Sequence, residues 1–261
     1  MRVRGAGLGL ALLLLAVACG GGQTAPAEQV SPGAASPWGE VLVFAAASLT
    51  DAFEEIAMEL SEANPGAKVT YNFAGSQQLA GQITQAAPAD VFASANQTQM
   101  DVVADAGLVA AEPQIFTSNL LEIAVEPGNP LGIQGLADLS RPDVTLVMAA
   151  EEVPAGQYAR QALDAAGVQV TPASLETDVR AVLSKVALGE ADAGIVYRSD
   201  IAAAGDDVEG VEIPLDQNVP ASYPIAVLTS APNPAAARAF VDFVTSRRGQ
   251  EILAKHGFAA S

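Results

Sequence analysis

Short apolar runs alternate with helical patterns along most of this 261-residue chain. In the first such pair, the apolar run 41–44 leads through three alanines into a pattern that places Phe53, Ile56 and Leu60 on one helical face. Further apolar runs of strand length lie at 69–73, 90–94, 120–125, 144–148, 193–197 and 224–228. Strands that alternate with helices are typical of an α/β fold, and we expect mostly parallel sheets.

The length of the chain and a break in its pattern predict two lobes. The segment 118–229 contains a complete α/β unit, and further helical patterns follow it. We expect the first lobe to consist of 40–117 together with 230–261, and the second lobe to consist of 118–229.

The first forty residues follow a different pattern. Two arginines precede an apolar stretch, 8–17, that is too short to span a bilayer and ends just before Cys19. This resembles a bacterial lipoprotein signal, in which the cysteine is lipidated and becomes the new N-terminus. Ala16 stands where such signals usually have Leu, so an ordinary secretory peptide is the alternative. We expect a lipoprotein signal peptide at 1–18 and a flexible tether, rich in Gly, Pro, Ser and Ala, at 19–39.

Composition excludes several functions. The formal net charge of −18 argues against binding to nucleic acid and against a basic membrane-binding face. Cys19 is the only cysteine and His256 the only histidine, so disulfides, thiol chemistry, histidine metal sites and Ser–His catalysis all lack residues. The negative charge does not exclude an anion ligand, because exposed charges beyond about 8 Å are largely screened at physiological salt.

Four predicted helices begin with small or backbone-exposing residues directly after a strand or loop. These starts lie at 48–50, 75–77, 154–156 and 177–179. The first N–H groups of a helix have no partner within it, and together with the helix dipole they favour anions. Ser48 also fits a capping box with Asp51, which is the ordinary structural interpretation of that serine. Two such starts in each lobe, facing a shared cleft, would surround an oxyanion with N–H and hydroxyl donors.

Eight segments carry a more specific resemblance: 43–49, 73–76, 87–92, 153–159, 178–180, 194–200, 223–227 and 243–258. Taken in order over 40–258, they are similar to the periplasmic molybdate-binding proteins of ABC importers. The resemblance implies a two-lobed periplasmic-binding-protein type II fold, with the ligand in the cleft between two α/β lobes. It further implies a monomeric, lipid-anchored protein of the cell envelope, at the outer face of the cytoplasmic membrane or in the periplasm. Such a protein has no cofactor and no enzymatic activity, and it captures molybdate or tungstate for a membrane permease.

The resemblance also implies a ligand set for the oxyanion. It carries over to Ser48, Ser76, Ala155, Val179 and Tyr197. The two serines and the tyrosine would contribute hydroxyl groups, whereas the alanine and the valine can contribute only backbone N–H groups. Molybdenum would be held through its oxygens, without direct metal ligands. One segment, 148–152, departs from the family, which usually has an Asp-Pro pair there, and this makes the loop before Ala155 less secure.

Several alternatives stay open at this point. Neutral donors suit a fully deprotonated oxyanion such as molybdate, tungstate or sulfate, whereas a protonated phosphate needs an acceptor, for which Asp178 is the nearby candidate. A hydrolase that uses Ser76 lacks the G-x-S-x-G elbow and a partner for His256. A sensory ligand-binding module is a third class. Tyr197 could be an ordinary core residue, and Arg180 could contact the anion or form an ion pair between the lobes.

Overall fold

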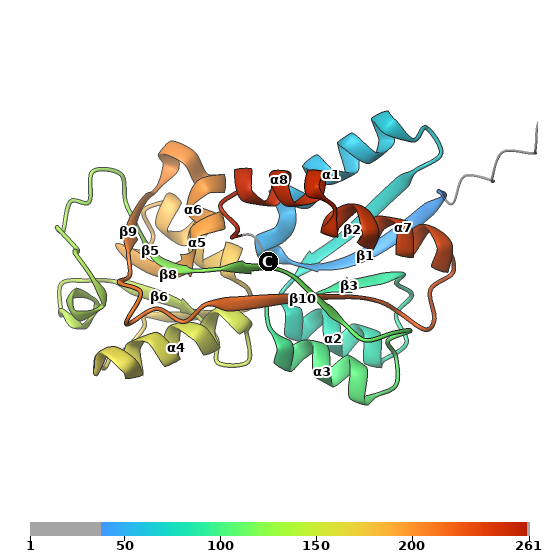
Figure 1. Ribbon diagram of the computed structural model, residues 1–261. Coiled ribbons are helices and arrows are strands. Elements are labelled where there is room, and N and C mark those ends of the chain that lie inside the picture. The colour runs from blue at the N-terminus through green and yellow to red at the C-terminus, as the bar shows by residue number, and fades with distance from the viewer. Residues whose placement is uncertain (1–37, 260–261) are drawn as a thin grey trace, which may run out of the picture. The chain divides into compact units, whose positions relative to one another are not determined.

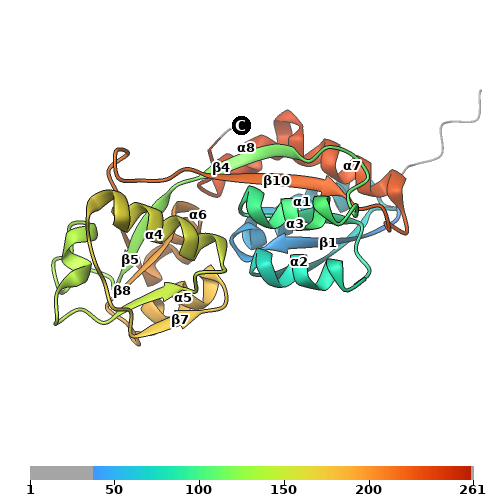
Figure 2. The same ribbon diagram turned by 90° about the horizontal axis from the view of Figure 1, so that it is seen from below.

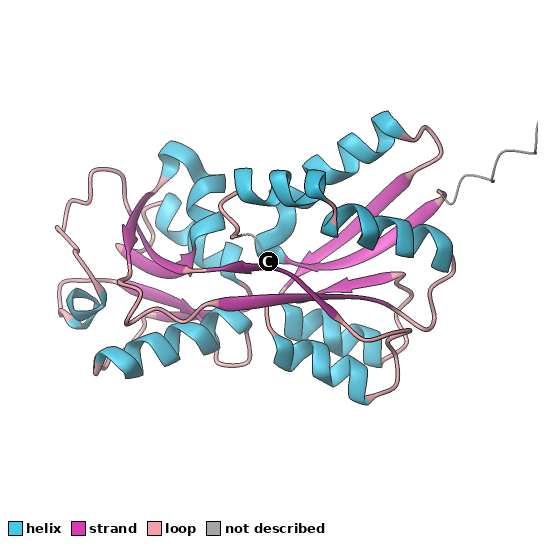
Figure 3. Cartoon of the chain, in the orientation of Figure 1, coloured by secondary structure: helices cyan, strands magenta, loops and turns pink. Residues whose placement is uncertain are grey.

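Two five-stranded sheets with helices packed on them make up residues 38–259, the part of the chain that the structure, a computed structural model, describes (Figure 1 and Figure 3). The predicted signal peptide, Cys19 and almost all of the predicted tether lie outside the described residues. No helix between residues 38 and 259 is long and apolar enough to cross a membrane.

The first sheet has the strand order β2-β1-β3-β10-β4. Its strands are β1 (Glu40–Ala46), β2 (Lys68–Ala74), β3 (Val91–Ala93), β4 (Gln114–Asn119) and β10 (Ala221–Val227). The helices that accompany it are α1 (Thr50–Ala63), α2 (Ser76–Thr84), α3 (Gln97–Asp105), α7 (Pro234–Thr245) and α8 (Arg247–Lys255), and a 3-10 turn, η1 (Ala47–Leu49), precedes α1. We call these elements the first lobe.

The second sheet has the strand order β7-β6-β8-β5-β9. Its strands are β5 (Leu121–Val125), β6 (Leu146–Ala149), β7 (Ser174–Glu176), β8 (Ala193–Tyr197) and β9 (Glu209–Glu212). Its helices are α4 (Pro154–Ala166), α5 (Val179–Ala187) and α6 (Arg198–Ala204), with the 3-10 turns η2 (Leu136–Ser140) and η3 (Gly205–Asp207). These elements are the second lobe.

Each sheet is half parallel and half antiparallel. In the first, β1 runs parallel to β2 and β3, whereas β10 runs antiparallel to β3 and β4. In the second, β6 runs parallel to β7 and β8, whereas β5 runs antiparallel to β8 and β9. The α/β class is confirmed, but the expectation of mostly parallel sheets is wrong. An apolar run indicates that a strand is buried. Parallel and antiparallel strands can be equally buried, so the run does not predict the direction of the strand.

The chain crosses between the lobes after β4 and again before β10 (Figure 2). Strand β10 pairs with β3 and β4, so it lies in the first lobe, although the sequence placed it in the second as part of 118–229. An apolar run does not indicate which sheet it joins, because both sheets offer a buried position. The C-terminal helices return to the first lobe as expected: Phe240 of α7 meets Phe53 of α1 edge-on, with ring centroids 5.7 Å apart.

Helix α8 is fixed to α1 by charged side chains. Glu55 of α1 accepts hydrogen bonds from Lys255 and from the His256 ring, both at 2.7 Å. The single histidine therefore has a structural partner at the end of the last helix, on the outside of the first lobe.

Candidate functional site

The five residues predicted to bind the oxyanion line one small pocket between the two lobes. Its walls are Ala46, Ala47, Ser48, Ala74, Gly75, Ser76 and Ala95 from the first lobe, and Val153, Pro154, Ala155, Asp178, Val179 and Tyr197 from the second. The cavity is about 10 Å³ in volume. All four predicted helix starts therefore converge, which sequence alone could not establish.

The two serines of the first lobe occupy equivalent places at the ends of neighbouring parallel strands. Ser48 lies in η1, directly after β1, and Ser76 is the first residue of α2, directly after β2. Both are almost fully buried. The Ser48 hydroxyl forms a 2.9 Å hydrogen bond with the Tyr223 hydroxyl, and the Ser76 Oγ accepts a hydrogen bond of 3.0 Å from the Ala95 N–H.

The capping interpretation of Ser48 is wrong. Helix α1 begins at Thr50 with Leu49 in the N-cap position, and no side chain caps it. The extra 3-10 turn moves the helix start two residues beyond Ser48, so the serine hydroxyl is released from capping and turns to Tyr223. The capping-box spacing could not reveal this, because it presumes that the helix starts directly after the serine.

The second lobe contributes backbone groups through Ala155 and Val179. Ala155 is the second residue of α4, which has Pro154 in its first turn and no side-chain cap. Val179 is the first residue of α5, where the Asp178 side chain accepts a 2.9 Å hydrogen bond from the Ala181 N–H. Because the first N–H groups of a helix have no intrahelical acceptor, both helix starts direct donors and a positive dipole end at the pocket.

The segment that departs from the family does not displace Ala155. Residues up to Ala149 complete β6, and α4 still begins at Pro154. The close packing of α4 on this segment depends on Gly156, where a Cβ atom would lie 2.0 Å from the Ala150 carbonyl oxygen and 2.5 Å from that of Ala149. Ala155 therefore lines the pocket despite the unusual segment before it, and its role as a ligand stays a prediction.

Tyr197 supplies the third hydroxyl group. It ends β8, is 1% exposed, and its Oη forms no hydrogen bond with any described residue. Burial raises the pKa of this hydroxyl well above its ordinary value, so the group is a neutral donor at physiological pH. A buried hydroxyl without a partner costs about 1–3 kcal/mol. Tyr197 therefore differs from an ordinary core residue, because it lines the pocket and its buried hydroxyl has no partner among the described residues.

Arg180 forms an ion pair between the lobes. Its guanidinium group binds Asp51 of α1 and lies 2.9 Å from Asp200 of α6, and it does not line the pocket. Asp200 is fully buried, and burial raises its pKa to about 6 although Arg180 opposes the shift. Because the folded state holds this proton more tightly, Asp200 stabilises the fold at pH values below about 4. This contribution is lost as the pH rises through about 6.

Two further hydrogen bonds join the lobes beside the pocket. Gln77 Nε2 of α2 donates to the Thr177 carbonyl oxygen over 2.8 Å, and Asn96 Nδ2 donates to Gln157 Oε1 over the same distance. Gly75 lies at the first of these contacts. A Cβ atom there would be 2.6 Å from Thr177 O. The lobes are therefore in direct contact around the pocket.

The donors that line the pocket are neutral hydroxyl and backbone N–H groups. Within residues 38–259, no group of three or more His, Cys, Asp or Glu side chains is arranged to hold a metal ion directly. Asp178 is the one carboxylate in the lining, and one of its oxygens is engaged as the N-cap of α5. Sequence reasoning missed Tyr223, which lies 175 positions from its partner Ser48, and no local spacing could have connected the two.

Known proteins resemble this chain in sequence and in fold. A sequence profile of the bacterial extracellular solute-binding protein family matches residues 41–259. The molybdate-binding protein ModA of Mycobacterium tuberculosis is 46% identical over 219 residues, which cover 84% of this chain and 84% of that protein. The solved periplasmic molybdate-binding protein of Azotobacter vinelandii has a TM-score of 0.75 at 19% identity, covering 85% of this chain and 99% of that one.

A second solved structure shows that the fold alone does not identify the bound oxyanion. The sulfate-binding protein SubI of Mycobacterium tuberculosis also has a TM-score of 0.75 at 19% identity, covering 84% of this chain and 86% of that one. These likenesses confirm the two-lobed periplasmic-binding-protein type II fold. They do not distinguish one tetrahedral oxyanion from another. The proteins found are binding proteins, which leaves the hydrolase alternative without support.

Proposed function

We propose that this chain, which belongs to the family of bacterial extracellular solute-binding proteins, captures molybdate in the pocket between its lobes and delivers it to the permease of an ABC importer. The observation that carries the proposal is the convergence of Ser48, Ser76, Ala155, Val179 and Tyr197 on one small buried pocket. The 46% identity to a protein named for molybdate binding supports the choice of ligand. Tungstate, which is nearly isosteric with molybdate, is the second expected ligand.

The chemistry of the donors favours a fully deprotonated oxyanion. Hydroxyl groups and backbone N–H groups face the pocket, and helix dipoles add positive potential. A hydrogen phosphate ion would bring a proton that needs an acceptor. Asp178 offers a carboxylate, but it already accepts from the Ala181 N–H and holds the start of α5. Phosphate should therefore bind poorly.

Sulfate is the remaining alternative, because it too is a dianion at neutral pH. The shared fold with a sulfate-binding protein does not exclude it. The sequence identity favours molybdate, since 46% over most of the chain far exceeds the 19% to the sulfate-binding structure. Discrimination then rests on size: a pocket shaped for the larger ion leaves sulfate short of some donors.

The ligand is expected to close the lobes and to be released when they open at the permease. We further propose that the protein works as a monomer without a cofactor. Lipidation of Cys19 would tether it at the outer face of the cytoplasmic membrane, with residues 19–39 as a flexible link. Labelled palmitate that is incorporated by the wild type but not by Cys19→Ser would support the anchor, and equal labelling would contradict it.

Titration calorimetry with molybdate, tungstate, sulfate and phosphate tests the function. We expect tight binding of the first two anions, weaker binding of sulfate by at least one order of magnitude, and no measurable heat with phosphate. An absence of heat with molybdate, or an equal affinity for sulfate, would refute the proposal.

A further inference from the structure

Tyr223 is a buried tyrosine beside the pocket that no part of the predicted ligand set includes. It lies on β10, pairs with Thr117 of β4 and is fully buried. The register of β10 shifts between Tyr223 and Pro224, and such bulges redirect a side chain. Pro224 fits an irregular position of this kind, because it has no N–H to offer a regular ladder.

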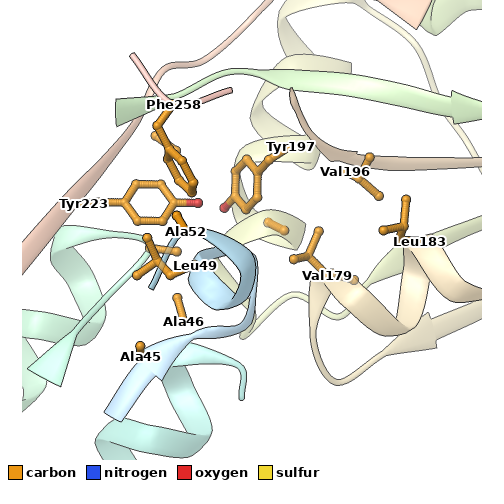
Figure 4. Close-up of a cluster of buried hydrophobic side chains, with 14 of the residues drawn as sticks. Ala45, Ala46, Leu49, Ala52, Val179, Leu183, Val196, Tyr197, Tyr223 and Phe258 are labelled. Atoms are coloured by element: carbon orange, nitrogen blue, oxygen red, sulfur yellow. The ribbon is translucent and has the colours of Figure 1, made fainter. Parts of the chain in front are cut away.

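Three aromatic rings hold the Tyr223 ring in one orientation. It packs edge-on against Phe258 at a centroid distance of 5.5 Å, against Tyr197 at 6.0 Å and against Phe116 at 6.4 Å. Figure 4 shows the hydroxyl ends of Tyr223 and Tyr197 turned toward each other. The Tyr197 hydroxyl nevertheless forms no hydrogen bond with a described residue, whereas the Tyr223 hydroxyl meets Ser48 Oγ at 2.9 Å.

The direction of this hydrogen bond matters for anion binding. A hydroxyl group carries one proton, and Ser48 can give that proton to an oxyanion only if it accepts from Tyr223. Burial is the largest influence on Tyr223 and raises the pKa of its hydroxyl above the ordinary value, so the hydroxyl retains a proton to donate. Ser76 shows the same arrangement with a fixed direction, since its Oγ accepts from the Ala95 N–H over 3.0 Å.

We propose that Tyr223 is a positioning residue: its hydroxyl donates to Ser48 Oγ and thereby directs the Ser48 proton into the pocket. The proposal rests on the proposed function, in which Ser48 binds an oxyanion. Both serines then have a protein donor on the side away from the ligand, and both present their protons to it. The Tyr197 hydroxyl, which forms no hydrogen bond with a described residue, keeps its own proton for the anion.

A double-mutant cycle tests this role by calorimetry with molybdate. The proteins are the wild type, Tyr223→Phe, Ser48→Ala and the double variant. Phenylalanine retains the packed ring and removes only the hydroxyl. In the wild-type background we expect Tyr223→Phe to weaken molybdate binding by about 3- to 10-fold, the usual value of one hydrogen bond. In the Ser48→Ala background, where no serine hydroxyl remains to be directed, we expect the same substitution to have no effect.

Tyr71→Phe is the matched control. Tyr71 is a mostly buried tyrosine of the same sheet whose hydroxyl donates to the Phe53 carbonyl oxygen over 2.6 Å, and it does not line the pocket. Its loss should lower stability and leave the affinity for molybdate unchanged.

Three results separate the possible failures. Wild-type affinity in Tyr223→Phe, or an equal loss in both backgrounds, overturns the positioning role and leaves the proposed function intact. A wild type that does not bind molybdate refutes the proposed function, and the role of Tyr223 with it.

Discussion

Gly75 lies where the two lobes touch, and we expect their closure on the ligand to depend on it. Gly75 precedes α2, and a Cβ atom at this position would lie 2.6 Å from the Thr177 carbonyl oxygen, whereas ordinary contact begins at 3.4 Å. The backbone angles of Gly75, φ −59° and ψ 136°, are open to any residue, so Gly75→Ala introduces a contact without backbone strain. The lobes would have to separate there by 3.4 − 2.6 = 0.8 Å.

The energetic cost comes from the contacts that this separation breaks. The hydrogen bond from Gln77 Nε2 to Thr177 O occupies the same space, and its loss costs about 0.5–1.5 kcal/mol. Val179 lies two residues further along, so its N–H also moves away from the anion. We expect a total loss of about 1–3 kcal/mol in molybdate binding, which is about 5- to 150-fold in Kd.

Calorimetry on Gly75→Ala and Gly81→Ala provides the assay. Gly81 lies within α2, the helix that Gly75 precedes, and a Cβ atom there meets nothing within 4 Å, so this control should bind molybdate like the wild type. It should also gain up to about 1 kcal/mol of stability from helix propensity. Equal affinity in both variants would refute the reasoning. So would a large fall in the melting temperature of ligand-free Gly75→Ala, because within the first lobe the added Cβ meets only the flexible end of the Gln77 side chain, at 2.6 Å, which can move away.

Three further predictions concern the pocket and its supports. Ser48→Ala and Tyr197→Phe should each weaken molybdate binding by about 1–3 kcal/mol, because an anion oxygen loses its donor; calorimetry in which both behave as the wild type would show the ligand assignment to be wrong. Asp200 has its pKa raised from 3.8 to about 6 by burial, a difference worth about 3 kcal/mol, which the wild type loses as the pH rises. The free energy of unfolding of Asp200→Asn, measured in urea, should therefore rise relative to the wild type by about that amount between pH 4 and pH 7, and a constant difference would contradict the role of the buried carboxyl. Gly156→Ala should destabilise the fold by about 1–3 kcal/mol or more, since its Cβ would meet the Ala150 carbonyl oxygen at 2.0 Å, and an unchanged urea midpoint would argue against this close packing.

The local pattern of apolar and polar residues predicted a large part of the fold. Apolar periodicity identified the strand before Ser48 and the helix after it, and Pro154 correctly marked the first turn of α4. These features depend on near neighbours in the chain, because strand and helix repeats place side chains on defined faces. Strand direction and sheet membership could not be predicted in this way, as β10 shows: its apolar run is equally compatible with either sheet.

The site divides in the same way. Sequence by itself determined that four helices begin with exposed N–H groups, and the resemblance to a family selected Ser48, Ser76, Ala155, Val179 and Tyr197 from among their neighbours. Tertiary structure decided that these groups share one pocket. It also decided that the Ser48 hydroxyl bonds to Tyr223 instead of capping α1, and that Arg180 joins the lobes outside the pocket. The physical reason is the distance along the chain over which the deciding contacts act. Helix starts are fixed by contacts within a few residues, whereas the partners of a buried hydroxyl or charge are fixed by how distant segments pack.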